Sequence, residues 1–98
     1  MDVLLIPEAV SDYDSLNENL RGLINQKIDE LKENPFLGKK LEDKHGMDLR
    51  GYRKIYAAQK AYRIIYRIEK DTIVIIGIGK RRNFEIYETV WKRIPNKD

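Results

Sequence analysis

Cysteine is absent from this 98-residue chain, and histidine occurs only once. Disulfide bonds and thiolate chemistry are therefore excluded, and a closed zinc site is not expected from a single histidine. No apolar run approaches the roughly 20 residues that a membrane-spanning helix needs. The opening MDVLLIPEAV has neither the basic start nor the apolar length of a signal peptide. We therefore expect a cytoplasmic protein that holds no metal or cofactor and does not bind a membrane.

Charge is distributed unevenly along the chain. Residues 1–48 carry 6 Lys/Arg and 11 Asp/Glu, a balance of −5, whereas residues 49–98 carry 13 and 5, a balance of +8. Between Arg50 and Arg82 there are 10 basic and 2 acidic residues. A basic surface of this kind attracts polyanions and speeds their encounter. The second half therefore either meets a nucleic acid or an acidic protein, or forms a solvated surface that keeps the protein soluble.

Hydrophobic spacing in the first half predicts one strand followed by two helices. Residues 2–6 form a short apolar run that we expect near a sheet edge. Apolar residues at helical steps then mark helices over 8–17 and 18–33, and the second ends at Asn34-Pro35. The acidic residues of these helices are interpreted as a solvated outer surface rather than a metal site: Asp12, Asp14, Glu18, Asp29, Glu30 and Glu33.

The second half changes to an alternating pattern. A loop is predicted at 36–48. Three segments rich in Tyr, Ile and Val follow, and their successive side chains are expected to point to opposite faces: residues 49–56, 61–69 and 72–80. They predict an antiparallel meander of three strands. Helical spacing returns at 84–94 and predicts a final helix.

The resulting order, β-α-α-β-β-β-α, predicts one α+β domain over residues 1–98. We expect a small antiparallel sheet with the N-terminal helical hairpin packed on one face and a C-terminal helix. The face that carries Arg63 and Arg67 would then be uncovered. The sequence GIGK at 77–80 does not predict a phosphate-binding loop, because no strand–loop–helix unit with GKS or GKT is present. Its glycines are expected to bend the strand or to admit a neighbouring backbone.

One set of side chains could carry chemistry on this sheet. Alternation places Lys54 and Tyr56 on one face of their strand, and Arg63 lies across the short turn AAQK. Arg81 follows the third strand, and Tyr87 comes from the last helix. Gathered cations bind phosphate, and tyrosine stacks on bases. Because RNA supplies its own nucleophile, the 2′-hydroxyl, such a site could cut the strand without a metal. The alternative is a solvated face with both tyrosines as partial core.

The sequence offers more than one candidate for the general base. Lysine has an ordinary pKa of about 10.4, which neighbouring cations lower. His45 lies in the polar loop KHGMD and is the residue type that most often transfers protons at neutral pH. A single loop histidine is either a further candidate for catalysis or incidental.

The segment AYRIIYRIEKDTIVIIGIGKRRNFEIY resembles the RelE/ParE toxin superfamily. Members share YRI(I/V)Y, a tight turn, a run of Ile and Val, then Gly-(His/Lys)-Arg and a tyrosine. Upstream, LKENPFLGKKLE resembles the end of the family's helical hairpin, and the likeness covers roughly residues 4–93. Within the superfamily, GKRRNFEIY resembles the RelE branch more than the ParE branch.

The resemblance implies the toxin of a type II toxin–antitoxin system, one that cuts mRNA in the ribosomal decoding site through the substrate 2′-hydroxyl. The positions that match the RelE catalytic pattern are Lys54, Arg63, Arg81 and Tyr87. The second lysine of that pattern falls on Tyr56, so Lys54 or Tyr56 acts as the base, or the activity is weak. RNA binding is expected from Tyr56 and from the remaining basic residues of this half: Arg53, Arg67, Lys80 and Arg82.

The resemblance also implies partners, namely a cognate antitoxin protein together with the ribosome and mRNA. Two alternatives to a nuclease stay open. The first is a ParE-like toxin that acts on DNA gyrase and causes a DNA damage response while protein synthesis continues. The second is a catalytically weakened relative that binds RNA or protein and is harmless when overexpressed.

Overall fold

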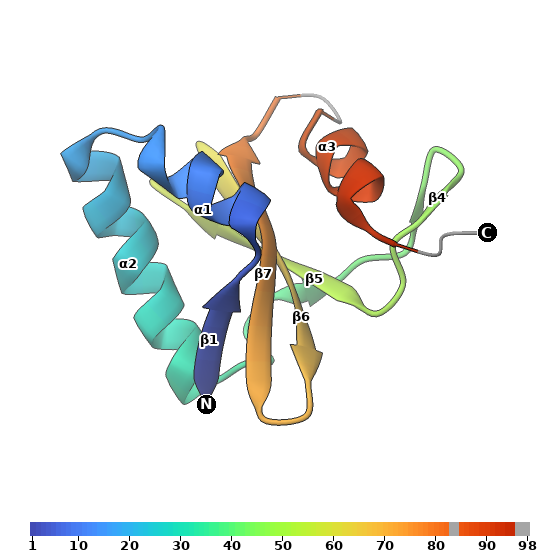
Figure 1. The fold of residues 1–98 in the computed structure, drawn as a ribbon, viewed down its shortest axis with the longest axis horizontal. Helices are drawn as coiled ribbons and strands as arrows, with labels where there is room; N and C mark the ends of the chain where they lie inside the picture. Colours follow the sequence, from blue (N-terminus) through green and yellow to red (C-terminus); the bar gives the residue numbers. More distant parts are fainter. Residues whose placement is uncertain (83–84, 96–98) are drawn as a thin grey trace.

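The computed structural model describes residues 1–82 and 85–95. The elements in chain order are β1 (Asp2–Leu5), α1 (Pro7–Asp14), α2 (Glu18–Glu33), β2 (Lys39–Lys40), β3 (Asp43–Lys44), β4 (Met47–Asp48), β5 (Tyr52–Ala57), β6 (Tyr62–Glu69), β7 (Thr72–Lys80) and α3 (Glu85–Arg93) (Figure 1). The predicted order is confirmed, and three very short strands lie where the sequence predicted an unbroken loop. Phe84, which the spacing assigned to the last helix, lies outside the described residues.

Five strands form one sheet in the order β1-β7-β6-β5-β2. The predicted antiparallel meander is confirmed for β5, β6 and β7. The first strand lies at the sheet edge, as expected, but it runs parallel to β7, so the sheet is mixed rather than wholly antiparallel. β3 and β4 pair with each other as a separate small hairpin.

The two N-terminal helices begin and end where their sequence directs. Pro7 occupies the first turn of α1, where its missing N–H costs nothing. The side chain of Asn17 caps α2 by accepting a hydrogen bond from Leu20 N at 2.9 Å. Asn34, before Pro35, is extended and ends the helix. α1 lies against β7, and α2 lies against β1 and β5.

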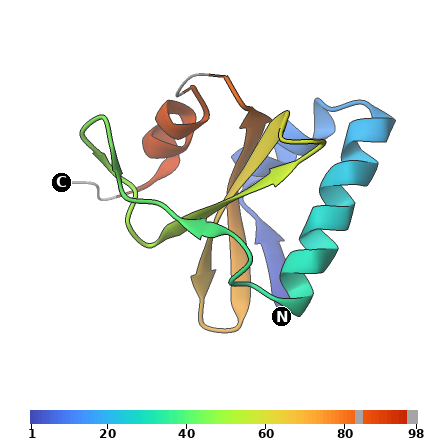
Figure 2. The same ribbon diagram turned by 180° about the vertical axis from the view of Figure 1, so that it is seen from behind.

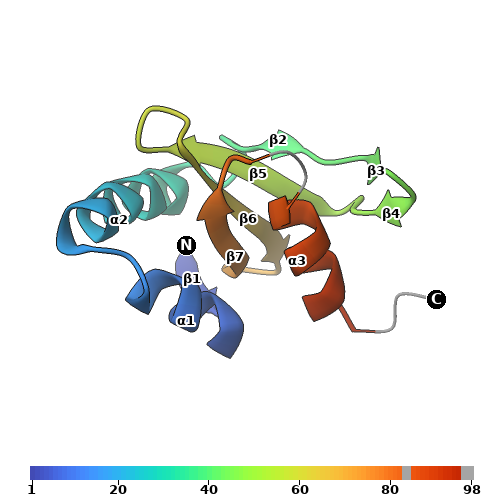
Figure 3. The same ribbon diagram turned by 90° about the horizontal axis from the view of Figure 1, so that it is seen from above.

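The helical hairpin covers one face of the sheet. The buried side chains between the hairpin and the sheet come from both layers: Ala9, Ile24 and Leu31 from the helices, and Ala57, Ile64, Tyr66, Ile73, Ile75 and Ile78 from the strands. This is the face opposite to that of Arg63 and Arg67, as the sequence predicted. α3 lies on the other side of β7 from the hairpin (Figure 3).

The second face is covered in part, so the prediction that it is bare is wrong. α3 packs Ile86, Tyr87 and Val90 against it, and the chain before β5 contributes Leu41 and Leu49. The β3–β4 hairpin lies beside α3, as Figure 2 shows. A second apolar core results under the face that carries Arg63, which is only 8% exposed. Burial of Leu41 and Leu49 could not be predicted, because the residues of this loop follow no helical or strand spacing.

A β-bulge shapes the strand under α3. Ile65 pairs with Gly77 and Tyr66 pairs with Ile75, which leaves Ile76 as the extra residue of β7. A Cβ on Gly77 would lie 2.8 Å from Val90 Cγ2, and a Cβ on Gly79 would lie 2.8 Å from Ile86 Cδ1. The two glycines therefore make room for side chains of α3 on the strand, rather than for a neighbouring backbone as expected from the sequence.

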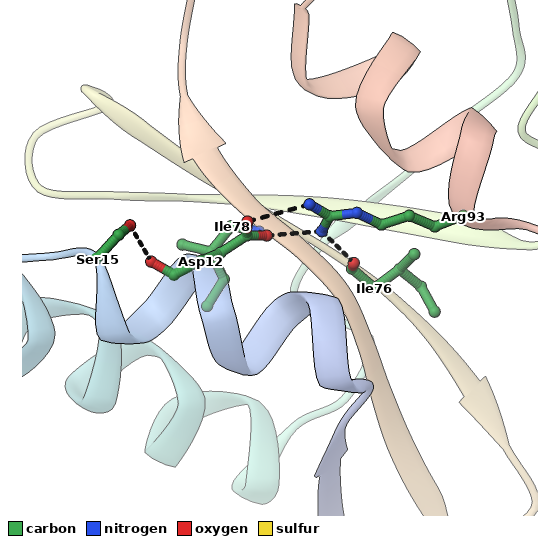
Figure 4. Close-up of polar contacts among 5 residues, drawn as sticks. All are labelled: Asp12, Ser15, Ile76, Ile78 and Arg93. Atoms are coloured by element: carbon green, nitrogen blue, oxygen red, sulfur yellow. Dashed lines mark hydrogen bonds and ion pairs between the residues drawn. The ribbon is translucent and has the colours of Figure 1, made fainter.

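The bulge is held by an ion pair between the first and last helices (Figure 4). Arg93 Nη1 donates to Asp12 Oδ2 at 2.7 Å and to the carbonyl of Ile76 at 2.9 Å. The same carboxylate accepts a hydrogen bond from Ile78 N at 3.0 Å. The pair thus satisfies backbone groups that the irregular ladder leaves unpaired. Asp12 is therefore a structural residue, and its interpretation as solvated surface is wrong.

A tyrosine fixes the segment that follows α2. Tyr66 is fully buried, and its hydroxyl accepts from Gly38 N at 2.9 Å and donates to the carbonyl of Pro35 at 2.8 Å. Gly38 has no space for a side chain, because a Cβ would meet the Tyr66 hydroxyl and the Lys54 carbonyl. The segment that leads to β2 is therefore anchored at the sheet centre. Within the described part of the chain, no helix has both the length and the apolar character needed to cross a bilayer.

Candidate RNA-cleavage site

The register of three strands brings the predicted site residues to one face of the sheet. Tyr56 of β5 lies opposite Arg63 of β6, and Arg63 lies opposite Gly79 of β7. Lys54 is two residues from Tyr56 and so shares its face. Arg81 continues the ladder beyond β7, since its N–H donates to the carbonyl of Ala61 at 2.8 Å.

Tyr56 is the centre of the group. The ammonium of Lys54 lies 5.3 Å from the centroid of its ring, and the guanidinium carbon atoms of Arg63 and Arg81 lie at 5.5 and 5.6 Å. The ammonium of Lys60 lies 6.0 Å from the same centroid. All four distances are within the range in which a cation is attracted to an aromatic ring. The structure thus brings Lys54, Tyr56, Arg63 and Arg81 together, as the sequence predicted.

Arg63 lies at the floor of the site. Its guanidinium is over two rings, 5.5 Å from the centroid of Tyr56 and 5.1 Å from that of Tyr87. Its Nε and Nη1 atoms are buried and have no hydrogen-bond partner among the described residues. An unsatisfied buried donor costs about 1–3 kcal/mol, and more when it is charged. Cation–π contact offsets part of this cost, and an anion bound beside Arg63 would offset more.

Tyr87 is joined to the site through Arg63, but it is only 2% exposed. It projects from the first turn of α3 into the second core, beside Ile86 and Val90. Its ring therefore supports the guanidinium from below rather than presenting an open surface to a nucleotide. This burial fits a residue that positions Arg63 better than the catalytic role predicted from the sequence.

Lys54 and Tyr56 are also joined by a polar contact. Lys54 Nζ donates to Tyr56 Oη at 3.4 Å. Burial of Tyr56 acts to raise the pKa of its phenol, but hydrogen bonding to Lys54 and the positive charges of Lys54 and Arg63 outweigh it. The pKa of Tyr56 is therefore lowered from its ordinary value, because nearby cations favour the phenolate.

The structure adds to the site two lysines that the sequence analysis missed. Lys60 belongs to the β5–β6 turn, where Ala58, Gln59 and Lys60 all have positive φ. Lys44 comes from β3, and its ammonium lies 5.7 Å from the Tyr87 ring centroid. No periodic signal could have found either one, because both depend on the path of a turn.

Within residues 1–82 and 85–95, the site has no acidic counter-ion. No salt bridge in this part of the chain involves any of the five basic residues of the site, which are Lys44, Lys54, Lys60, Arg63 and Arg81. We call these five residues together with Tyr56 the basic cluster. Uncompensated cations at one place give a local positive potential that concentrates anions.

The other basic residues predicted to bind RNA lie outside the basic cluster. Arg53 is on the opposite face of β5, where its Nη1 donates to the carbonyl of Gly38 at 2.8 Å. Lys80 pairs with Tyr62 and so also lies on the hairpin face. Arg67 is paired with Glu69 at 2.7 Å, and Arg82 lies 3.9 Å from Glu85. Arg53 and Lys80 are therefore misplaced for a contact shared with Arg63.

His45 is exposed at the tip of the β3–β4 hairpin, in a left-handed turn with φ of 52°. The hairpin does fold toward the second face of the sheet, as a catalytic role for this loop would require. The residue that reaches Tyr87 is its neighbour Lys44. The hairpin thus delivers a lysine to the site, which weakens the case for His45.

The basic cluster has the parts needed to act on a phosphodiester. Two guanidinium groups can hold phosphate oxygens and neutralise charge that develops in the transition state. The 2′-hydroxyl of RNA provides a nucleophile next to the phosphate. The partly exposed ring of Tyr56 offers a surface for base stacking.

The family of the chain follows from comparison with known proteins. The model of the ParE toxin of type II toxin–antitoxin systems matches residues 3–83. The chain belongs to the RelE/ParE toxin superfamily. The match spans β2 to β7, both N-terminal helices and all of β1 but its first residue, so it covers the strands that carry Lys54, Tyr56 and Arg63.

Relatives place this toxin in the RelE-like branch. The mRNA interferase toxin RelE of Escherichia coli (strain K12) is 27% identical over 88 residues, which is 88% of each chain. An arginine mutant of E. coli RelE in the free state superposes with a TM-score of 0.74 at 25% identity, covering 95% of this chain and 96% of that one. The RelBE2 toxin–antitoxin complex of Mycobacterium tuberculosis superposes with a TM-score of 0.67 at 25% identity, covering 82% of this chain and 96% of that one. The α+β fold of the toxin is thus that of RelE structures.

Proposed function

We propose that this toxin is an endoribonuclease that cuts mRNA on the ribosome, in the cytoplasm, with the substrate 2′-hydroxyl as nucleophile. The observation that carries the proposal is the basic cluster, in which cations from four segments surround Tyr56. Among the described residues, no carboxylate forms a salt bridge with any of these cations. The likeness to a relative named mRNA interferase, at 27% identity, supports the same activity.

Each residue of the cluster has a part in this reaction. Arg63 and Arg81 bind the scissile phosphate and stabilise the charge that grows on its oxygens. Tyr87 and the second core hold the Arg63 guanidinium in place. Lys44 and Lys60 add positive charge that draws the RNA backbone to the site. Arg67 and Arg82, which are on the surface, contribute longer-range attraction.

We also propose that a cognate antitoxin protein binds this toxin. RelE-type toxins have been solved with antitoxin chains, including the RelBE complex of E. coli and the RelBE2 complex of M. tuberculosis. An acidic segment of such a partner would complement the basic cluster. Co-expression with the protein encoded next to the toxin gene should yield a stable complex in which cleavage is inhibited.

The test is cleavage of a defined mRNA by purified toxin on programmed ribosomes. The expected result is cutting within the codon in the decoding site, with little cutting of the same RNA free in solution. Arg63→Ala and Arg81→Ala should each lower the rate by about 10²–10³, as the loss of one transition-state contact does. Lys32→Ala, which removes an exposed charge from α2, is the matched control and should cut like wild type.

Intact mRNA at an excess of toxin over ribosomes would overturn the proposal. A ParE-like action on DNA gyrase is then the second candidate, since the matching family model is that of a ParE toxin. It would appear as inhibited supercoiling by purified gyrase. Salt-sensitive RNA binding without either activity would indicate the weakened relative.

A further inference from the structure

The phenol of Tyr56 is the point where the positive charges of the site converge. The four cations over its ring come from different places in the chain: Lys54 from β5, Lys60 from the turn after it, Arg63 from β6 and Arg81 from beyond β7. The four cations lie within 6.0 Å of the ring centroid, and the ammonium of Lys54 also contacts the ionisable hydroxyl.

Such an arrangement favours loss of the phenolic proton. Each nearby cation stabilises the phenolate relative to the neutral phenol. Lys54 adds a directed contact, because its Nζ lies 3.4 Å from Tyr56 Oη and can donate a hydrogen bond to the anion. The lowered pKa of Tyr56 agrees with this geometry, since the hydrogen bond from Lys54 and the cationic charges outweigh the opposing effect of burial.

We propose that Tyr56 is the general base that takes the proton from the 2′-hydroxyl of the RNA, an inference that rests on the proposed endonuclease function. The other groups are less suited to the role. Arginine stays protonated in proteins. Tyr87 is 2% exposed and lies under Arg63. Lys54 serves as the cation that stabilises the Tyr56 phenolate.

The step balances without a metal or a redox partner. The phenolate oxygen of Tyr56 takes the proton of the 2′-hydroxyl, and the 2′-oxygen forms a bond to the adjacent phosphorus. The bond from phosphorus to the 5′-oxygen breaks, and that oxygen takes a proton from water. The hydroxide so formed removes the proton from Tyr56 and restores the phenolate. The products are a 2′,3′-cyclic phosphate and a 5′-hydroxyl, and Arg63 and Arg81 hold the charge throughout.

The first experiment compares wild type with Tyr56→Phe on programmed ribosomes. This change keeps the ring and its cation–π contacts and removes only the hydroxyl. We expect the single-turnover cleavage rate to fall by about 10²–10⁴, the usual contribution of a general base. Ribosome binding and the thermal midpoint should be unchanged, because the ring still fills its place.

The second experiment replaces Tyr56 alone with 3,5-difluorotyrosine, whose phenol loses its proton at lower pH. For a general base, the wild-type rate should rise about tenfold per pH unit below the pKa of Tyr56 and level off above it. In the fluorinated protein, this rising limb of the pH–rate profile should be displaced to lower pH. If the hydroxyl has only a structural or stacking role, the rising limb should not move.

The outcomes separate the two proposals. If wild type does not cut mRNA, the proposed function fails. If wild type cuts and Tyr56→Phe cuts equally fast, the function stands and the assignment of Tyr56 is wrong. An unmoved pH limb in the fluorinated protein also overturns the assignment, even if Tyr56→Phe is slow. Loss of rate together with a displaced limb supports it.

Discussion

The carboxylate of Asp12, in α1, and the guanidinium of Arg93, the last residue of α3, meet at 2.7 Å beside the bulge of β7. Their side chains are 19% and 15% exposed, so the pair is largely shielded from water. It connects the two layers of helices through the strand between them. Arg93 also donates to Ile76 and Asp12 accepts from Ile78, so the pair and the bulge stabilise each other.

Asp12→Ala should therefore lower the free energy of unfolding by about 2–3 kcal/mol, because it leaves a buried guanidinium and a backbone N–H without their acceptor. Chemical denaturation at neutral pH measures the change. Asp14→Ala is the matched control on the same helix. Asp14 is exposed, so its removal should change stability by less than about 0.5 kcal/mol. Equal effects of the two changes would contradict the structural role of Asp12.

Gly77→Ala should destabilise the protein by about 1–3 kcal/mol, the usual cost of overpacking. The added methyl would lie 2.8 Å from Val90 Cγ2 and force α3 away from the strand. Gly22→Ala provides the comparison, since nothing lies within 4 Å of a Cβ at this position in α2. It should stabilise the helix by about 0.5–1 kcal/mol. Thermal unfolding of both variants would show shifts of opposite sign.

Tyr66→Phe should cost about 1–3 kcal/mol, because it leaves Gly38 N–H and the Pro35 carbonyl without a partner. Tyr62→Phe, at a half-buried position on the same strand, should cost less than about 0.5 kcal/mol. Unfolding in denaturant distinguishes the two. Comparable losses would show that the Tyr66 hydroxyl does not anchor the segment after α2.

The same tyrosine predicts a pH dependence. Burial raises the pKa of Tyr66, and hydrogen bonding to Gly38 and the charge of Arg53 oppose this only in part. The folded protein therefore keeps this proton to higher pH than the unfolded chain does. Its contribution to stability is complete below the ordinary tyrosine pKa of about 10 and is lost as pH rises above it. Between about pH 9 and pH 11, wild type should lose more stability than Tyr66→Phe.

Arg63→Met should lower the cleavage rate by about 10²–10³, as Arg63→Ala does. It should also leave the protein more stable, by about 1 kcal/mol, since a buried cation with unpaired donors is replaced by an apolar side chain of similar length. The measurements are single-turnover cleavage and the denaturation midpoint of the same preparation. A large loss of stability would mean that the contacts with Tyr56 and Tyr87 outweigh the cost of burial.

The parts of this site that the sequence predicted are those that strand geometry controls. Lys54, Tyr56 and Arg63 could be placed together because alternation has a period of two and the AAQK turn sets the pairing of β5 with β6. The parallel pairing of β1 could not be predicted, since an apolar run carries no information on strand direction. Lys44 and Lys60 were missed because turns place them.

The second core was missed for a related reason. Leu41 and Leu49 flank the β3–β4 hairpin in a polar segment without periodicity, so nothing in their spacing predicts burial. Asp12 looked like the other acidic residues of its helix, and only the position of Arg93 distinguishes it. Contacts between elements far apart in the chain are what local patterns fail to predict.

The parallel pairing of β1 with β7 has a consequence for how the molecule is made. The first strand finds its neighbour about 70 positions later, as in the pairing of Asp2 with Thr72, and the last helix must arrive before Tyr87 can support Arg63. Contacts of such long sequence separation form late in folding. A growing polypeptide therefore lacks both its edge strand pairing and the contact of Tyr87 with Arg63 until almost all of it has been translated, so an incomplete copy has not yet assembled the site.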